Sequence, residues 1–162
     1  MEQYLRDQEP EPVIEAHPLR QWQSELVEIL KRPPSPRHVI FVVDTAGNAG
    51  KSWFARYYQQ VYGDSLRLTP CRKVDMIYGI YSTLKQFKVF FVDIARSRMD
   101  NEGNKLFPYE LMEELKNGEL FNSKYSSETF RFPVPHVVCM CNEEPNMTML
   151  SEDRYVFIRT TN

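Results

Sequence analysis

Residues 39–52 read VIFVVDTAGNAGKS, and the organisation of the whole chain can be worked out from this stretch. Its first five residues are an unbroken apolar run, which is typical of a strand buried on both faces. A loop of small residues follows and ends in Gly50, Lys51 and Ser52, and residues 53–62 then show a helical pattern closed by Gly63. The order of strand, small-residue loop, Lys-Ser and helix predicts a phosphate-binding loop.

Each part of this loop has a physical task. Glycines allow backbone N–H groups to curl around phosphate oxygens, and the helix start adds further N–H groups and the positive end of its dipole. We expect Lys51 to reach the outer phosphates of a nucleotide and the Ser52 hydroxyl to ligate Mg²⁺. The predicted nucleotide-binding residues are Thr45, Ala46, Gly47, Asn48, Ala49, Gly50, Lys51 and Ser52.

One position departs from the general G-x-x-x-x-G-K-[ST] pattern. The pattern has glycine where this chain has Thr45, and the additional glycine here is Gly47. The alternative interpretation is a glycine turn that happens to precede a lysine. The preceding buried strand and the following helix favour nucleotide binding.

Composition and charge limit the class of protein. The chain has 162 residues, of which 42% are hydrophobic, and this is enough for one domain with a core. The net charge of −2 excludes a chain-wide basic field for nucleic acid, although residues 1–17 hold five of the acidic side chains and only one basic one. Any nucleic-acid contact is therefore expected to be a local patch.

Cysteine and histidine usage indicates a reducing compartment and no zinc site. The three cysteines are odd in number, and Cys139 and Cys141 are expected to pack in the core on one face of a strand. The three histidines are scattered. There is neither an apolar run of membrane-spanning length nor a signal-peptide pattern, so we expect a soluble intracellular protein with no membrane partner.

The remaining patterns predict an α/β domain over residues 18–162, preceded by an acidic flexible tail over residues 1–17. Helices are expected from Pro18 to residue 30, over residues 74–87 with a break near Gly79, and over residues 108–116. Further strands are expected at residues 66–68, 88–93, 136–141 and 155–158, with a loop at 100–105 and a hairpin within 119–132. Alternating strands and helices predict a mainly parallel sheet with the site at the carboxyl ends of its strands.

Polar residues at the ends of the predicted strands narrow the chemistry. Asp93 ends one strand, where a carboxylate can hold Mg²⁺; an aspartate that caps the next turn is the alternative, and the presence of Lys51 and Ser52 favours the metal. Asn142 ends another, where an amide can bind the γ-phosphate or orient water; a turn-forming asparagine is nearly as good an interpretation.

Three more residues are candidates for contacts outside the phosphate loop. Arg154 could stabilise transition-state charge in a neighbouring subunit, although a solvated arginine is the better interpretation when this residue is taken alone. Lys124 and Tyr125 lie at the predicted hairpin tip, where a lysine can contact phosphate and a tyrosine can stack on a base. The alternative is an ordinary polar hairpin.

Taken together, these blocks resemble the superfamily 3 helicase domain, and most of all the ATPase half of the replication-associated proteins of small circular single-stranded DNA viruses. The resemblance runs from Pro18 to the C-terminus. It rests on the order and spacing of an initial Trp-Gln helix, a Walker A loop that tolerates a non-glycine at position 45, a Walker B strand, a DNA-contacting hairpin, a sensor strand and an arginine-finger block. These lie at residues 19–23, 44–52, 91–96, 116–125, 135–146 and 150–155.

The resemblance implies a P-loop NTPase fold of the AAA+-like kind, a mainly parallel sheet flanked by helices, with an inserted β-hairpin. It implies a homo-oligomeric ring, hexameric in the family, that uses ATP and Mg²⁺ to move along single-stranded DNA or RNA, with water as the only phosphate acceptor. A viral DNA replication protein of this kind would act in the host nucleus. The implied catalytic residues are Lys51, Asp93, Asn142 and Arg154, the implied metal ligands are Ser52 and Asp93, and the implied nucleic-acid contacts are Lys124 and Tyr125.

Two features depart from the family. Many relatives have two consecutive acids at Walker B, but here Ile94 follows Asp93, which leaves Glu113 and Glu114 as distant candidates for the base. Full-length viral replication proteins also carry an endonuclease with a His-hydrophobic-His pair, which this sequence lacks, so we expect no nicking by this chain alone. Two other functions stay open: a nucleoside-kinase type phosphotransferase, and a module that binds ATP or nucleic acid without hydrolysis.

Overall fold

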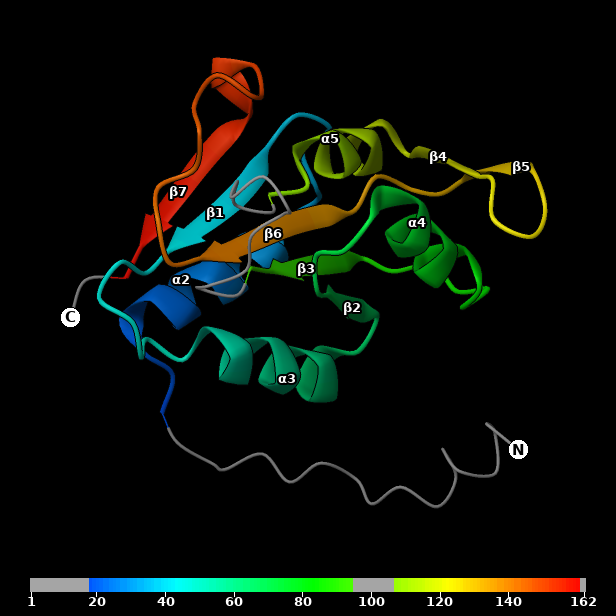
Figure 1. Cartoon of the computed structure of the whole chain (residues 1–162). Coiled ribbons are helices and arrows are strands. Elements are labelled where there is room, and N and C mark those ends of the chain that lie inside the picture. Colours follow the sequence, from blue (N-terminus) through cyan, green and yellow to red (C-terminus); the bar gives the residue numbers. More distant parts are fainter. Residues whose placement is uncertain (1–17, 95–106, 161–162) are drawn as a thin grey trace.

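Five strands form the central sheet of the computed structural model, which describes residues 18–94 and 107–160. The sheet order is β2-β3-β6-β1-β7, and every neighbouring pair is parallel. Figure 1 shows the strands side by side with their carboxyl ends at one edge. The strands are β1 (Val39–Val43), β2 (Ser65–Leu68), β3 (Val89–Asp93), β6 (His136–Cys141) and β7 (Tyr155–Arg159).

Two core clusters lie on opposite faces of this sheet, because successive side chains of a strand alternate between faces. On one face Ile40 and Val42 of β1 pack with helices α2 (Gln21–Leu30) and α3 (Lys51–Tyr62). On the other face Phe41 packs with α4 (Lys73–Tyr81) and α5 (Tyr109–Asn117). Both faces are therefore covered, which explains the unbroken apolar runs of β1 and β6 (Figure 1).

Most of the predicted elements are confirmed, with three corrections at helices. The helix predicted from Pro18 begins at Gln21, and the helix predicted from Pro108 begins one residue later, with Pro108 as its cap. The helix predicted over residues 74–87 with a break near Gly79 is wrong in both respects, because α4 runs unbroken through Gly79 and ends at Tyr81. The tail at residues 1–17, the loop at 100–105 and the end of the Walker B block at 95–96 lie outside the described residues.

The predicted hairpin is present as strands β4 (Glu119–Asn122) and β5 (Glu128–Arg131), which pair antiparallel and form a sheet of their own. Figure 1 shows this hairpin beside α4, at the opposite side of the molecule from the carboxyl ends of β1, β3 and β6. Within residues 18–94 and 107–160, no helix has the length and apolar character needed to cross a membrane.

Alanine substitutions at two glycines are predicted to change the free energy of unfolding in opposite directions. Gly118 ends α5 with a φ of 74°, and a Cβ there would lie 2.9 Å from the carbonyl oxygen of Phe132. Gly118→Ala is therefore expected to lower the free energy of unfolding by about 1–2 kcal/mol or more. Gly79 lies inside α4 with no atom within 4 Å of such a Cβ, so Gly79→Ala should raise it by about 0.5–1 kcal/mol.

Urea denaturation of both variants beside the unsubstituted chain checks this pair. Gly79→Ala is the matched control, since it makes the same chemical change in an unstrained helical position. A destabilising Gly79→Ala would mean that α4 is interrupted at this residue, as the sequence pattern suggested.

Candidate functional site

The carboxyl ends of β1, β6 and β3 meet around a cleft of about 410 Å³. Strand β6 lies between the other two in the sheet, so the residue after β6 lies between the loop after β1 and the end of β3. The cleft is lined by Asn48, Ala49, Gly50, Lys51, Ser52, Trp53, Arg67, Thr69, Asp93, Ile94 and Asn142. The structure thus brings together the second half of the predicted phosphate loop, Asp93 and Asn142.

Asp44 shapes the loop that follows β1. Its carboxylate is fully buried and accepts hydrogen bonds from the N–H groups of Gly47 (2.8 Å) and Ala49 (3.0 Å). Lys51 Nζ lies 3.0 Å from the same carboxylate. Burial alone would raise the pKa of Asp44, but the Lys51 ammonium and the two N–H groups hold it below its usual value.

Side chains from the start of α2 hold three consecutive carbonyl groups of the loop. Arg20 Nη1 donates to the Asn48 oxygen (2.8 Å), Trp22 Nε1 donates to the Ala49 oxygen (3.0 Å), and Gln23 Nε2 donates to the Gly50 oxygen (3.4 Å). Gly50 has a φ of 84°, and a Cβ there would lie 3.1 Å from Gln23 Nε2, so glycine is favoured for both conformation and space. The loop is therefore anchored from outside before helix α3 begins at Lys51.

A second ion pair, between Arg67 and Asp93, lies at the same cleft. Ser52 Oγ donates to Asp93 Oδ2 at 3.0 Å, which brings together the two predicted Mg²⁺ ligands. Arg67, on β2, donates to the same carboxylate oxygen from Nε and from Nη2. Hydroxyl and carboxylate oxygens are ligands that Mg²⁺ accepts, so the residues present fit such an ion together with nucleotide phosphates.

Asn142 connects the ends of β6 and β1. Its Nδ2 donates to the carbonyl oxygen of Asp44 at 3.1 Å, which fixes the amide beside the phosphate loop. An amide held at this place can meet a phosphate or a water molecule in the cleft. Thr45, Ala46 and Gly47 belong to the same loop but do not line the cleft.

The hairpin residues lie away from the cleft. Lys124 Nζ forms an ion pair with Asp75 Oδ1 on α4 and lies 5.7 Å and 5.5 Å from the ring centroids of Tyr78 and Tyr125. The hydrogen bond to Asp75 raises the pKa of Lys124 above its ordinary value. Tyr125 is 83% exposed and packs edge-on against Tyr78. The hairpin tip thus places a cation and the exposed ring of Tyr125 against the half-buried Tyr78 of α4.

Arg154 lies at the other end of the sheet from the cleft. It ends a short 3₁₀ turn just before β7, and Tyr155 pairs with Val39 at the amino end of β1. The side chain is buried: Nη1 donates to the Arg37 oxygen at 3.3 Å, and Nε lies 3.6 Å from Glu113 Oε2. The guanidinium therefore lies away from the phosphate loop of its own chain.

The two distant candidates for a catalytic base do not line the cleft either. Glu113 contacts Arg154, and Glu114 Oε1 lies 2.8 Å from Lys73 Nζ. Among the described residues that line the cleft, Asp93 is the only carboxylate. Buried Ile94 follows it directly.

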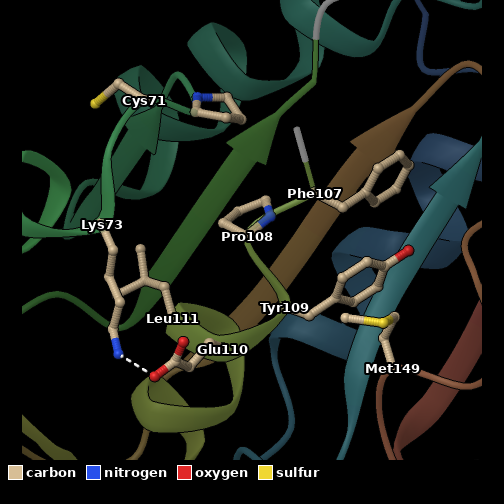
Figure 2. Close-up of a pocket in the computed structure, with 9 residues that line it drawn as sticks. Cys71, Lys73, Phe107, Pro108, Tyr109, Glu110, Leu111 and Met149 are labelled. Carbon is tan, nitrogen blue, oxygen red and sulfur yellow. Dashed lines mark hydrogen bonds and ion pairs between the residues drawn. The ribbon is translucent and has the colours of Figure 1, made fainter. Parts of the chain in front are cut away.

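A second pocket, of about 290 Å³, lies beside the start of α5 (Figure 2). Its wall is mainly apolar, and Lys73 Nζ and Glu110 Oε1 form an ion pair of 2.6 Å there. None of the predicted site residues lines it. The lining residues are Pro70, Cys71, Lys73, Phe107, Pro108, Tyr109, Glu110, Leu111 and Met149.

Sequence reasoning assigned no role to two charged residues of the site. Asp44 could have been found by the rule that found Asp93, since it too is a carboxylate directly after a buried strand. Arg67 gave a weaker signal, because an arginine between two leucines of a short strand resembles any solvated charge.

Comparisons with known proteins identify relatives of this chain. No family model matches it. Para-Rep C6 of Subterranean clover stunt C6 alphasatellite is 34% identical over 145 residues, which cover 87% of this chain and 47% of that protein. Para-Rep C7 of Faba bean necrotic yellows C7 alphasatellite is 34% identical over 142 residues, 86% of this chain and 48% of that protein.

A third relative, Para-Rep C10 of Milk vetch dwarf C10 alphasatellite, is 32% identical over 142 residues, again 86% of this chain and 48% of the relative. The chain therefore spans about half the length of the curated relatives that it matches. Over most of its own length, this chain is a homologue of the Para-Rep proteins of alphasatellites.

Proposed function

We propose that this chain is the ATP-driven motor part of a replication-associated protein, which assembles as a ring and moves along single-stranded nucleic acid. The observation that carries the proposal is the meeting of Lys51, Ser52, Asp93 and Asn142 in one cleft at the strand ends. The homology to Para-Rep proteins supports a role in replication of a single-stranded DNA virus or satellite.

Each of these residues has a separate role in the proposed reaction. Lys51 leaves Asp44 to bind the outer phosphates, Ser52 and Asp93 hold Mg²⁺, and Asn142 contacts the γ-phosphate or the attacking water. When bound, Mg²⁺ neutralises charge on the β- and γ-phosphates. Arg154 acts on the nucleotide of a neighbouring subunit, and Lys124 with Tyr125 contacts the nucleic acid.

Steady-state ATP hydrolysis, measured with and without single-stranded DNA over a range of protein concentrations, tests this function. Turnover that rises with both DNA and protein concentration is expected for a ring whose sites are shared between subunits. Phosphorylation of a nucleoside by ATP, unaffected by DNA, would contradict the motor function and indicate a phosphotransferase.

A second candidate function is binding of ATP or nucleic acid without turnover. The observation that favours it is that Asp93 is the only carboxylate among the described residues that line the cleft. Ile94 stands where many relatives have a second acid, and Glu113 and Glu114 form ion pairs elsewhere. Assembled rings that bind ATP and DNA but release no phosphate would establish this candidate instead.

Lys124→Ala is expected to keep basal ATP hydrolysis and to lose its stimulation by single-stranded DNA. The physical reason is that the substitution removes a phosphate-binding cation from the hairpin tip and leaves the cleft untouched. Hydrolysis measured against DNA concentration gives the stimulation directly. Lys88→Ala is the matched control, because Lys88 is 82% exposed and lies outside the hairpin. Equal stimulation of Lys124→Ala and Lys88→Ala would remove Lys124 from the DNA contact.

A further inference from the structure

Two cations that line the cleft, Lys51 and Arg67, are each ion-paired with a carboxylate at or just after a strand end. Lys51 is paired with Asp44 after β1, and Arg67 is paired with Asp93 at the end of β3. The first cation is expected in any phosphate loop. Arg67 has no place in that pattern, yet it lines the same cleft.

The position of Arg67 follows from strand alternation. Leu66 and Leu68 pack on the sheet face that α4 and α5 cover, so Arg67 points to the face that carries α3. Helix α3 starts there with Lys51 and Ser52. As a result Arg67 Nη2 lies 3.5 Å from Ser52 Oγ, while Nε donates to Asp93 Oδ2 at 3.0 Å.

The guanidinium of Arg67 therefore binds the two side chains that would ligate Mg²⁺. A carboxylate oxygen that accepts two N–H groups of an arginine and a serine hydroxyl is poorly placed to coordinate a cation at the same time. Mg²⁺ and Arg67 would therefore compete for Asp93, since both are cations attracted to the same carboxylate.

We propose that Arg67 is a nucleotide-sensing residue of the cleft, which holds Asp93 until Mg²⁺ arrives and then binds the terminal phosphate of the nucleotide in the same chain. The inference rests on the proposed function. The guanidinium lies beside Ser52 in the cleft that Lys51 also lines, and once released its planar set of N–H donors would match phosphate oxygens better than an ammonium does. Arg67 would then make the cleft prefer nucleoside triphosphate to diphosphate before any neighbour contributes Arg154.

Fluorescent analogues of ADP and of a non-hydrolysable ATP test this by binding alone, over a titration of Mg²⁺. In Arg67→Gln we expect the affinity for the triphosphate to fall about tenfold and that for the diphosphate to change less than about twofold. The Mg²⁺ concentration that gives half-maximal binding should fall about threefold or more, because Asp93 is no longer occupied by a competing cation.

Arg159→Gln is the matched control, since Arg159 is also an ion-paired arginine at the carboxyl end of a strand but does not line the cleft. It should leave both affinities and the Mg²⁺ midpoint unchanged. Arg67→Lys keeps the positive charge but loses the planar guanidinium donors, so it should lose most of the preference for the triphosphate. This variant provides the same test if Arg67→Gln fails to fold.

The outcomes separate this inference from the proposed function. If the unsubstituted chain binds neither analogue, the nucleotide site itself is wrong, and the inference is wrong with it. If it binds both, and Arg67→Gln keeps the same preference and the same Mg²⁺ midpoint, Arg67 is only a structural ion pair. The proposed function would then stand without it.

Discussion

Lys51→Met is expected to reduce ATP hydrolysis by about a hundredfold or more and to destabilise the fold as well. The loss of hydrolysis follows from removal of the ammonium that would bind the outer phosphates. The loss of stability follows because Asp44 is fully buried and Lys51 is its cationic partner. Since the N–H groups of Gly47 and Ala49 remain, we expect a decrease of about 1–3 kcal/mol in the free energy of unfolding.

A second substitution separates these two effects. Asp44→Asn combined with Lys51→Met removes the buried negative charge that lacks its partner, so most of the stability should return while hydrolysis stays lost. Urea denaturation and phosphate release on the same three proteins measure both quantities. Hydrolysis that recovers in the double variant would show that Lys51 acts only through folding and does not bind phosphate.

The pH dependence of the stability difference follows from the pKa of Asp44. In the intact chain this pKa is lowered, so the stabilisation by the ion pair is present above the ordinary value and is lost as the pH falls through the lowered one. In Lys51→Met the buried carboxyl group loses its main counter-charge, so its pKa rises and protonation relieves the penalty. The stability difference between the two proteins should therefore narrow as the pH falls from about 7 to about 4.

The sequence predicted the strands well because this sheet is covered on both faces. Residues 39–43 and 137–141 are uninterrupted apolar runs, and the predicted ranges 39–43 and 136–141 match β1 and β6. Gly79 misled it, since glycine is unfavourable in a helix by about 1 kcal/mol relative to alanine. The buried contacts of Met76, Ile77 and Ile80 keep α4 continuous through it.

The sequence predicted the cleft residues that lie at strand ends, and it missed those whose position depends on a distant partner. Asp93 and Asn142 follow from the rule that strand ends meet at one edge of a parallel sheet. The order that places β6 between β1 and β3 depends on pairing between distant residues, which no local pattern encodes. Trp22 shows the same limit: it packs in the core as its spacing predicts, and its Nε1 also holds the Ala49 carbonyl of the loop.

Arg154→Ala is expected to abolish ATP hydrolysis when tested alone and to recover activity when mixed with Lys51→Met. Arg154 lies before β7, at the opposite end of the sheet from its own phosphate loop, so its proposed action is on a neighbour. In rings mixed at random from equal amounts, about a quarter of the interfaces join an intact Lys51 to an intact Arg154. Turnover of about a quarter of the unsubstituted value is therefore expected if the sites act independently.

The burial of Arg154 defines the controls. Burial lowers the pKa of Lys116 to about 8, and the nearby charge of Arg154 contributes to this shift. Loss of Arg154 therefore removes its repulsion with Lys116 as well as its contacts with Glu113 and Arg37. The variant should therefore fold, which thermal denaturation checks. Arg37→Ala is the matched control, because this neighbouring arginine is exposed and paired with Asp153.

Mixing separates an action in the neighbour's site from a structural role. If Arg154 only stabilises the base of β7, Arg154→Ala subunits stay inactive in every ring, and mixing with Lys51→Met restores nothing. If Arg154 acts across the interface, the guanidinium must leave Glu113 and meet the phosphates of the next subunit, which are the stronger anionic partner. Activity that depends on the mixing ratio and peaks at equal amounts is the signature of that exchange.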